Sequence, residues 1–144
     1  MASLVDTNIL VYCFDSRDLA KRAAARDLLR RGAADQSICI PHQALIEFVS
    51  VVTRQTRGPL LSPEEATRQA EGFIADFHVL YPNELVFRTA LWGKATYQMP
   101  WFDAHLWAYA EHYSLAEIIS EDFQDGRMYG RVRVRNPFLT LGAD

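Results

Sequence analysis

The stretch Ala2-Ser3-Leu4-Val5-Asp6-Thr7-Asn8 (residues 2–8) sets a pattern that the rest of the chain repeats. Its apolar residues predict a short buried strand over residues 2–6. Asp6 and Thr7 are both good N-caps, so a helix is expected to follow at once, to about Phe14. A strand that leads directly into a helix is typical of α/β folds. This first strand ends in an acidic residue, Asp6, which is unusual for an apolar segment.

The remainder of the chain continues the alternation of strands and helices. Strands are expected at residues 37–40, 78–81 and 116–120 and at the sheet edge at 132–134, and helices at 18–31, from 41, from 62, at 83–97 and at 102–113. Strands separated by helices form a mostly parallel sheet that is covered on both faces. We therefore expect one α/β domain over residues 1–144, with a central sheet of four to five strands flanked by helices.

Two helices carry more detailed predictions. The helix over residues 18–31 is amphipathic, and Gly32 is expected to end it. Its inward face is predicted to hold Leu19, Ala23, Leu28 and Leu29, and its outward face Arg22, Arg26 and Arg30. The helix from Pro41 is expected to run for roughly fifteen residues, a typical length, until Arg57-Gly58-Pro59 breaks it.

Four acidic residues end predicted strands or interrupt apolar segments: Asp6, Glu47, Asp103 and Asp122. A buried carboxylate costs several kcal/mol unless it is paired or binds a metal. Asp6 and Asp122 both follow strands, and in parallel sheets the functional site lies beyond the carboxyl ends of the strands. The pattern predicts that the fold gathers the four acids around a divalent cation. An all-oxygen site favours Mg²⁺ or Mn²⁺ over zinc.

Each acid also has a simpler interpretation. Asp6 is a good helix N-cap, Asp103 suits the positive end of a helix, and Asp122 suits a turn. Glu47 lies on a narrow polar stripe with Gln43 and Ser50 that faces either water or a site.

Three further residues are expected to support the site. Asn8 is placed to orient a carboxylate or an attacking water, and Ser120 lies on the same side of its strand as Asp122. Asp125 adds a ligand, directly or through water, or else forms a turn with Gly126. Glu121 is expected to point away.

Five segments together resemble one known family: Val5-Asp6-Thr7-Asn8, Leu45-Ile46-Glu47-Phe48, Trp101-Phe102-Asp103-Ala104, Ile119-Ser120-Glu121-Asp122-Phe123 and Arg135-Asn136-Pro137-Phe138. Their order and spacing are similar to those of PIN-domain ribonucleases, and more narrowly of the toxins of VapBC-type toxin–antitoxin pairs. The resemblance extends from Ser3 to Phe138 and implies a PIN-like three-layer fold.

The resemblance also implies a function. It suggests a metal-dependent endoribonuclease toxin of a type II toxin–antitoxin system, which hydrolyses RNA phosphodiester bonds with metal-activated water. The catalytic and metal-binding residues would be Asp6, Glu47, Asp103 and Asp122. Mg²⁺ or Mn²⁺ would be the cofactor, with Glu47 either a ligand or the base that orients the water. The expected partners are RNA, a cognate antitoxin and a second copy of the chain.

Composition is compatible with this interpretation. Hydrophobic residues make up 49% of the 144 residues, so a disordered chain is not expected, and the net charge of −3 argues against general electrostatic binding of nucleic acid. Cys13 and Cys39 are expected to be buried free thiols in a reducing cytoplasm. The sequence shows no signal peptide and no apolar run long enough for a membrane span.

Three other functions remain open. A haloacid-dehalogenase-type phosphatase needs a second aspartate where this chain has Asn8, and a phospho-receiver domain needs a late lysine that is missing here. A catalytically silent RNA-binding or interaction module would not need the four acids. Six aromatic residues either stack RNA bases or belong to the core or a dimer surface: Tyr97, Trp101, Phe102, Trp107, Tyr109 and Tyr113.

Overall fold

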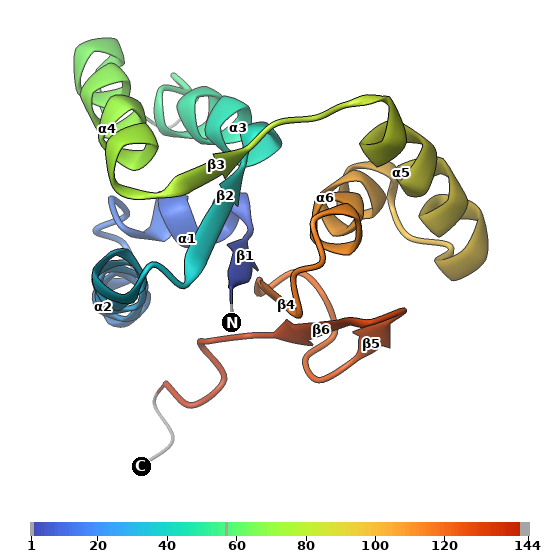
Figure 1. Ribbon diagram of the computed structural model, residues 1–144. Helices are drawn as coiled ribbons and strands as arrows, with labels where there is room; N and C mark the ends of the chain where they lie inside the picture. Colours follow the sequence, from blue (N-terminus) through green and yellow to red (C-terminus); the bar gives the residue numbers. More distant parts are fainter. Residues whose placement is uncertain (1, 57, 142–144) are drawn as a thin grey trace.

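The computed structural model describes residues 2–56 and 58–141, and over them strands and helices alternate as predicted (Figure 1). The first half of the chain contains β1 (Ser3–Val5), α1 (Thr7–Tyr12), α2 (Leu19–Asp35), β2 (Ile38–Pro41), α3 (His42–Val52) and α4 (Pro63–Asp76). The second half contains β3 (His78–Leu80), α5 (Glu84–Tyr97), α6 (Trp101–His112), β4 (Glu117–Ile119), β5 (Met128–Tyr129) and β6 (Val132–Arg135). Within the described ranges no helix is both long and apolar enough to cross a membrane.

One sheet contains all these strands, in the order β3-β2-β1-β4-β6-β5. Every neighbouring pair is parallel except β5 and β6. The α/β class with a mostly parallel sheet is therefore confirmed, but the sheet has six strands rather than four to five. The strand expected at the edge, β6, in fact lies between β4 and β5. The prediction missed β5 because two residues are too few to show an alternating pattern.

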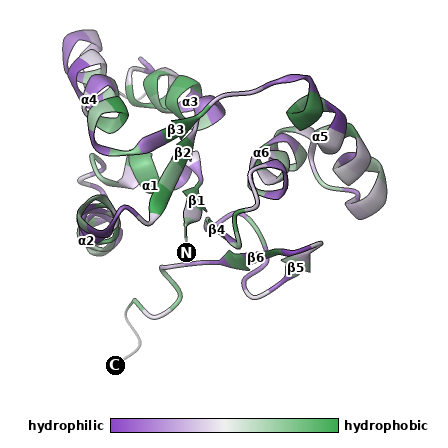
Figure 2. Cartoon of the chain, in the orientation of Figure 1, coloured by the Kyte–Doolittle hydropathy of each residue, from purple (hydrophilic) through white to green (hydrophobic). Residues whose placement is uncertain are grey.

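Helices cover both faces of the sheet. Successive side chains of a strand point to opposite faces, so each central strand contributes to two separate cores. Leu4 packs in a core with α5 and α6, whereas Val5 packs in a second core with α1, α2, α3 and α4. This is the expected three-layer arrangement. In Figure 2 hydrophobic residues colour α1, β2 and α3, whereas α2 is largely hydrophilic.

The helix α2 differs from its prediction in two respects. It runs through Gly32 to Asp35, because Gly32 serves packing and not termination: a Cβ there would lie 2.1 Å from Cδ1 of Ile38. The helix ends instead at Gln36, whose φ is 57°. Leu19 and Ala23, predicted to be inward, are exposed, and the buried face consists of Ala25, Leu28, Leu29 and Gly32.

The other helix boundaries largely agree with the sequence. Ser62 and Asn83 cap α4 and α5 as predicted, with their side chains accepting from the backbone N–H groups of Glu65 and Val86. Helix α3 ends at Val52, earlier than expected. The helix was expected to break at Arg57-Gly58-Pro59, and of these three residues Arg57 lies outside the described ones.

The topology creates one crevice. The chain places β2 and β3 on one side of β1 and β4, β6 and β5 on the other, so the strand order reverses between β1 and β4. Crevices at such switch points, beyond the carboxyl ends of the strands, are where ligands bind in α/β sheets. Asp6 and Ser120 follow these two strands directly.

Candidate functional site

The register of the sheet brings Asp6 beside Ser120. Val5 pairs with Ile119, and the Asp6 backbone N–H donates to the carbonyl of Ile119. The Ser120 hydroxyl then donates to Oδ2 of Asp6 across 2.6 Å. Oδ1 of Asp6 accepts from the backbone N–H of Thr7 at 2.6 Å, so Asp6 is also the N-cap of α1. The cap and the site interpretations of Asp6 are therefore compatible.

Burial brings the pKa of Asp6 close to neutral pH. Only 8% of the residue is exposed. Desolvation is the main cause that raises the pKa of Asp6 to about 7, with smaller contributions from the negative charges of Asp122 and Asp103. The hydrogen bonds from Ser120 and Thr7 act in the opposite direction.

Asn8 links the ends of the two strands. Its Nδ2 lies 3.1 Å from Oδ2 of Asp122, 3.3 Å from Oγ of Ser120 and 3.5 Å from Oδ2 of Asp6. The Ser120 hydroxyl also accepts from the backbone N–H of Asp122 at 3.0 Å. The predicted supporting positions of Asn8 and Ser120 fit these contacts.

Glu47 reaches the same place from α3. Its Oε2 accepts from the Thr7 hydroxyl at 2.8 Å, and its Oε1 accepts from Nε2 of Gln43 at 3.0 Å. The polar stripe of α3 thus faces the crevice through Gln43 and Glu47, while Ser50 is exposed. Thr7 was not predicted, since its role depends on a residue forty positions away.

Asp103 lies in the first turn of α6, and Asp122 lies just after β4. Burial, and then the charges of Asp122 and Glu47, raise the pKa of Asp103. All four predicted acids line one pocket of about 380 Å³, which we call the acidic pocket. Because the negative charges of their neighbours help to raise the pKa of Asp6 and Asp103, the pocket favours a cation.

The donor set fits a hydrated divalent cation. Carboxylate oxygens suit Mg²⁺ and Mn²⁺, and the buried Oδ1 of Asn8 has no hydrogen-bond partner within the described ranges. Over residues 2–56 and 58–141, no three carboxylate, histidine or cysteine side chains approach closely enough to hold a metal together. Mg²⁺ keeps several of its waters in proteins, so ligation here would run partly through water.

Comparison with known proteins identifies the family. The family model described as PIN domain matches residues 3–128. This chain belongs to the PIN-domain family. The membership is shown for most of the chain, and it sets aside the phosphatase and phospho-receiver alternatives. No curated protein matches the sequence.

Solved structures share the fold of this PIN domain at low identity. The toxin–antitoxin complex from Klebsiella pneumoniae is 22% identical, with a TM-score of 0.68 over 94% of this chain and 98% of that one. DNA-bound VapBC from Salmonella typhimurium is 17% identical, with a TM-score of 0.67 over 95% and 98%. The sarcin-ricin loop cleaving toxin VapC20 from Mycobacterium tuberculosis is 13% identical, with a TM-score of 0.61 over 81% and 87%.

For two acidic residues near Asp122, the structure decides between the alternatives for Asp125 and corrects the prediction for Glu121. Asp125 does not line the acidic pocket of the PIN domain; it forms a turn with Gly126, closed by the hydrogen bond from the Arg127 N–H to the Gln124 carbonyl, and its Oδ1 accepts from the backbone N–H of Asn136 at 2.8 Å. Glu121 was expected to point away, yet it lines the pocket wall. It is held there by Lys21 at 2.9 Å and by the Tyr12 hydroxyl at 2.6 Å.

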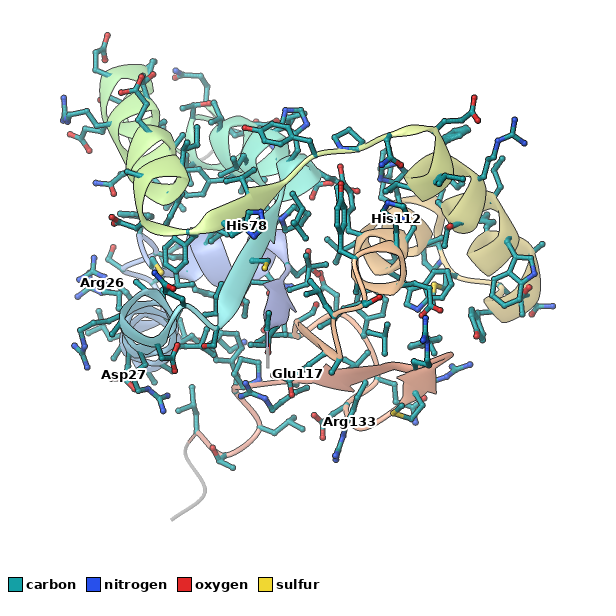
Figure 3. The ribbon with its side chains drawn as sticks, viewed as in Figure 1. Arg26, Asp27, His78, His112, Glu117 and Arg133 are labelled. Atoms are coloured by element: carbon teal, nitrogen blue, oxygen red, sulfur yellow. The ribbon has the colours of Figure 1, made fainter. Side chains whose placement is uncertain are left out.

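Among the described residues, no histidine lines the acidic pocket. Arg17 reaches the acidic pocket but pairs with Asp15 at 2.8 Å, and the Arg26 guanidinium donates to the carbonyl of Cys13. Figure 3 shows Arg26 on α2, His78 on β3 and His112 on α6, from separate elements. Both cysteines are buried and free, as expected.

Proposed function

We propose that this PIN domain is a Mg²⁺- or Mn²⁺-dependent endoribonuclease that acts in the cytoplasm as the toxin of a type II toxin–antitoxin pair. The observation that carries the proposal is the convergence of Asp6, Glu47, Asp103 and Asp122 on one pocket. A module that only binds RNA gains nothing from carboxylates that repel phosphate. Four of them beside a phosphodiester require a cation.

The side chains of the acidic pocket have different proposed roles. Asp6, Asp103 and Asp122 would hold the cation, which when bound lowers the pKa of water and neutralises the phosphodiester. Asn8 and Ser120 fix the orientation of the Asp6 and Asp122 carboxylates. Thr7 and Gln43 each hold one oxygen of Glu47. The remaining lone pairs of Glu47 then suit it to a ligand role or to accepting a proton from the attacking water.

The purified protein should cleave single-stranded RNA with Mg²⁺ or Mn²⁺ and lose this activity in excess chelator. Asp6→Asn should abolish cleavage while its circular dichroism spectrum stays unchanged. Asp125→Asn is the matched control, because Asp125 lies outside the acidic pocket, and it should retain activity. Cleavage that persists in chelator, or in Asp6→Asn, contradicts the proposal.

Hydrolysis by water has a specific product. The downstream fragment should carry a 5′-phosphate and the upstream fragment a 3′-hydroxyl, because the ribose 2′-hydroxyl is not the nucleophile. A single 2′-deoxy substitution at the cut site should weaken binding at most. Mass spectrometry of the fragments distinguishes the routes, and a 2′,3′-cyclic phosphate on the upstream fragment would refute hydrolysis.

The antitoxin is proposed from the solved structures with this fold, several of which are toxin–antitoxin complexes. A tail that offers an arginine to the acidic pocket would form charge-assisted hydrogen bonds with its carboxylates. Co-expression with the product of the neighbouring gene should yield a complex whose RNA cleavage is suppressed. If no complex co-purifies, the antitoxin proposal fails while the nuclease proposal stands.

A further inference from the structure

A second pocket lies directly beside the acidic pocket. It has a volume of about 410 Å³ and is lined by the rings of His42, Phe87, Trp101, Phe102 and His105; we call it the aromatic pocket. Gln43, Glu47 and Phe102 line both pockets, so the two are continuous. An occupant that spans both would bring an anionic group, through a cation, to the acids and an apolar or aromatic group to the rings.

Three rings of the aromatic pocket, those of Phe87, Trp101 and His105, pack against one another. Phe87 and Trp101 meet edge to face with centroids 5.7 Å apart, and Trp101 meets His105 in the same way at 6.1 Å. Phe102 is 68% exposed although it directly precedes Asp103. The most exposed ring of the pocket is therefore adjacent in the chain to an acid of the acidic pocket.

The polar edge of the aromatic pocket has a defined hydrogen-bond pattern. Nε2 of Gln43 faces two acceptors, Oε1 of Glu47 and the carbonyl of Phe102, so Oε1 of Gln43 must face His105. Nδ1 of His105 lies 2.9 Å from that oxygen and must carry the proton of a neutral ring. Nε2 of His105 is then an acceptor on a residue that lines the pocket.

We propose that the aromatic pocket receives an unpaired nucleobase of an RNA strand whose adjacent phosphodiester lies in the acidic pocket. This inference rests on the proposed nuclease function and names its substrate more closely as RNA with an unstacked base next to the cut. A base fits the apolar walls through its π face, and its exocyclic amino group can donate to His105. RNA is commonly recognised through single-stranded bases stacked on aromatic side chains.

The test uses the full chain with Asp6→Asn, so that RNA binds without being cut. The probe is a single-stranded RNA oligonucleotide that carries 2-aminopurine at one position in turn, whose fluorescence falls on stacking. Quenching is expected at one position only. Phe102→Leu should remove the quenching and weaken binding by about tenfold, whereas Phe102→Trp should retain both. Ile74→Ala, a control at an exposed apolar residue on α4, should change neither.

Failure here is distinguishable from failure of the nuclease proposal. If the wild-type protein cleaves RNA in a metal-dependent way but Phe102→Leu binds and quenches normally, the aromatic pocket does not receive a base. The nuclease proposal then still stands. If Phe102→Leu instead converts a dimer to a monomer with unchanged RNA affinity, the pocket receives a second copy of the chain. That result also overturns the inference.

Discussion

Asp6 links the site to the stability of the protein through its proton. Between pH 3.8 and about 7 the folded chain binds one more proton at Asp6 than the unfolded chain does. Its contribution to the free energy of unfolding therefore falls as the pH rises through that range. The cost is that of removing the carboxylate charge of Asp6 from water.

Asp6→Asn should for this reason stabilise the metal-free protein at high pH. We expect its melting temperature to exceed that of the wild type by several degrees at pH 8 and to differ little at pH 4. Thermal unfolding in chelator, followed by circular dichroism at both pH values, measures the difference. An equal change at both pH values would show that charge burial at Asp6 is not the cause.

Ser120 lowers the pKa of the Asp6 carboxyl group. Its hydroxyl is fully buried, so Ser120→Ala should raise that pKa further. The acidic limb of the cleavage rate against pH should then move to higher pH, and the protein should lose about 1–3 kcal/mol of stability. Ser50→Ala, on the exposed side of α3, should leave the profile in place, and a profile unmoved by Ser120→Ala would contradict this role.

At the residue scale, sequence reasoning named the four acids that line the acidic pocket and placed Asn8 and Ser120 beside them, but it missed Thr7 and Tyr12. Asp6, Glu47, Asp103 and Asp122 stand out because each is costly in its apolar or strand-end setting. Thr7 and Tyr12 carry no such signal, because a hydroxyl in a helix is unremarkable until its tertiary partner is known. Glu121 was misjudged for the same reason: Lys21, which holds it, is 100 positions away.

The α5–α6 pair depends on close packing at one glycine. A Cβ on Gly93 would lie 2.5 Å from Cζ3 of Trp107, which is fully buried. Gly93→Ala should force the helices apart and cost about 1–3 kcal/mol. Gly72→Ala, in the interior of α4 with no atom near the added Cβ, should instead stabilise by about 0.4–1 kcal/mol. Urea unfolding of both variants makes the comparison, and similar values would contradict the packing argument.

A second glycine that serves packing, Gly32, explains why the end of helix α2 was predicted too early. Gly32 suggested a helix end, because glycine is the usual residue just past one. Here it makes room for Ile38, and the left-handed position falls on Gln36 instead. Sequence-based prediction identified most strands and helices from apolar periodicity and cap residues, but it could not tell a packing glycine from a terminating one.

The whole molecule has an apolar outer face on α5. Leu85, Leu91 and Trp92 are each more than half exposed, and exposed apolar patches often mark interfaces. We expect a dimer in light scattering, which Leu91→Glu should convert to a monomer with an unchanged circular dichroism spectrum. Ile74→Glu on α4 is the control and should stay dimeric; a monomeric wild type at high concentration would contradict the expectation.

The hydrogen bond between Ser120 and Asp6 joins residues 114 positions apart, and this separation has a consequence for synthesis of the protein. Ribosomes add roughly 5–20 residues per second from the N-terminus, so Asp6, Glu47 and Asp103 are all synthesised before β4. Until β4 pairs with β1, the first acid has neither its hydroxyl donor nor Asp122 beside it. A chain that is truncated before β4 is therefore expected to lack an assembled acidic pocket, and the pocket is complete only once the last strands have been synthesised.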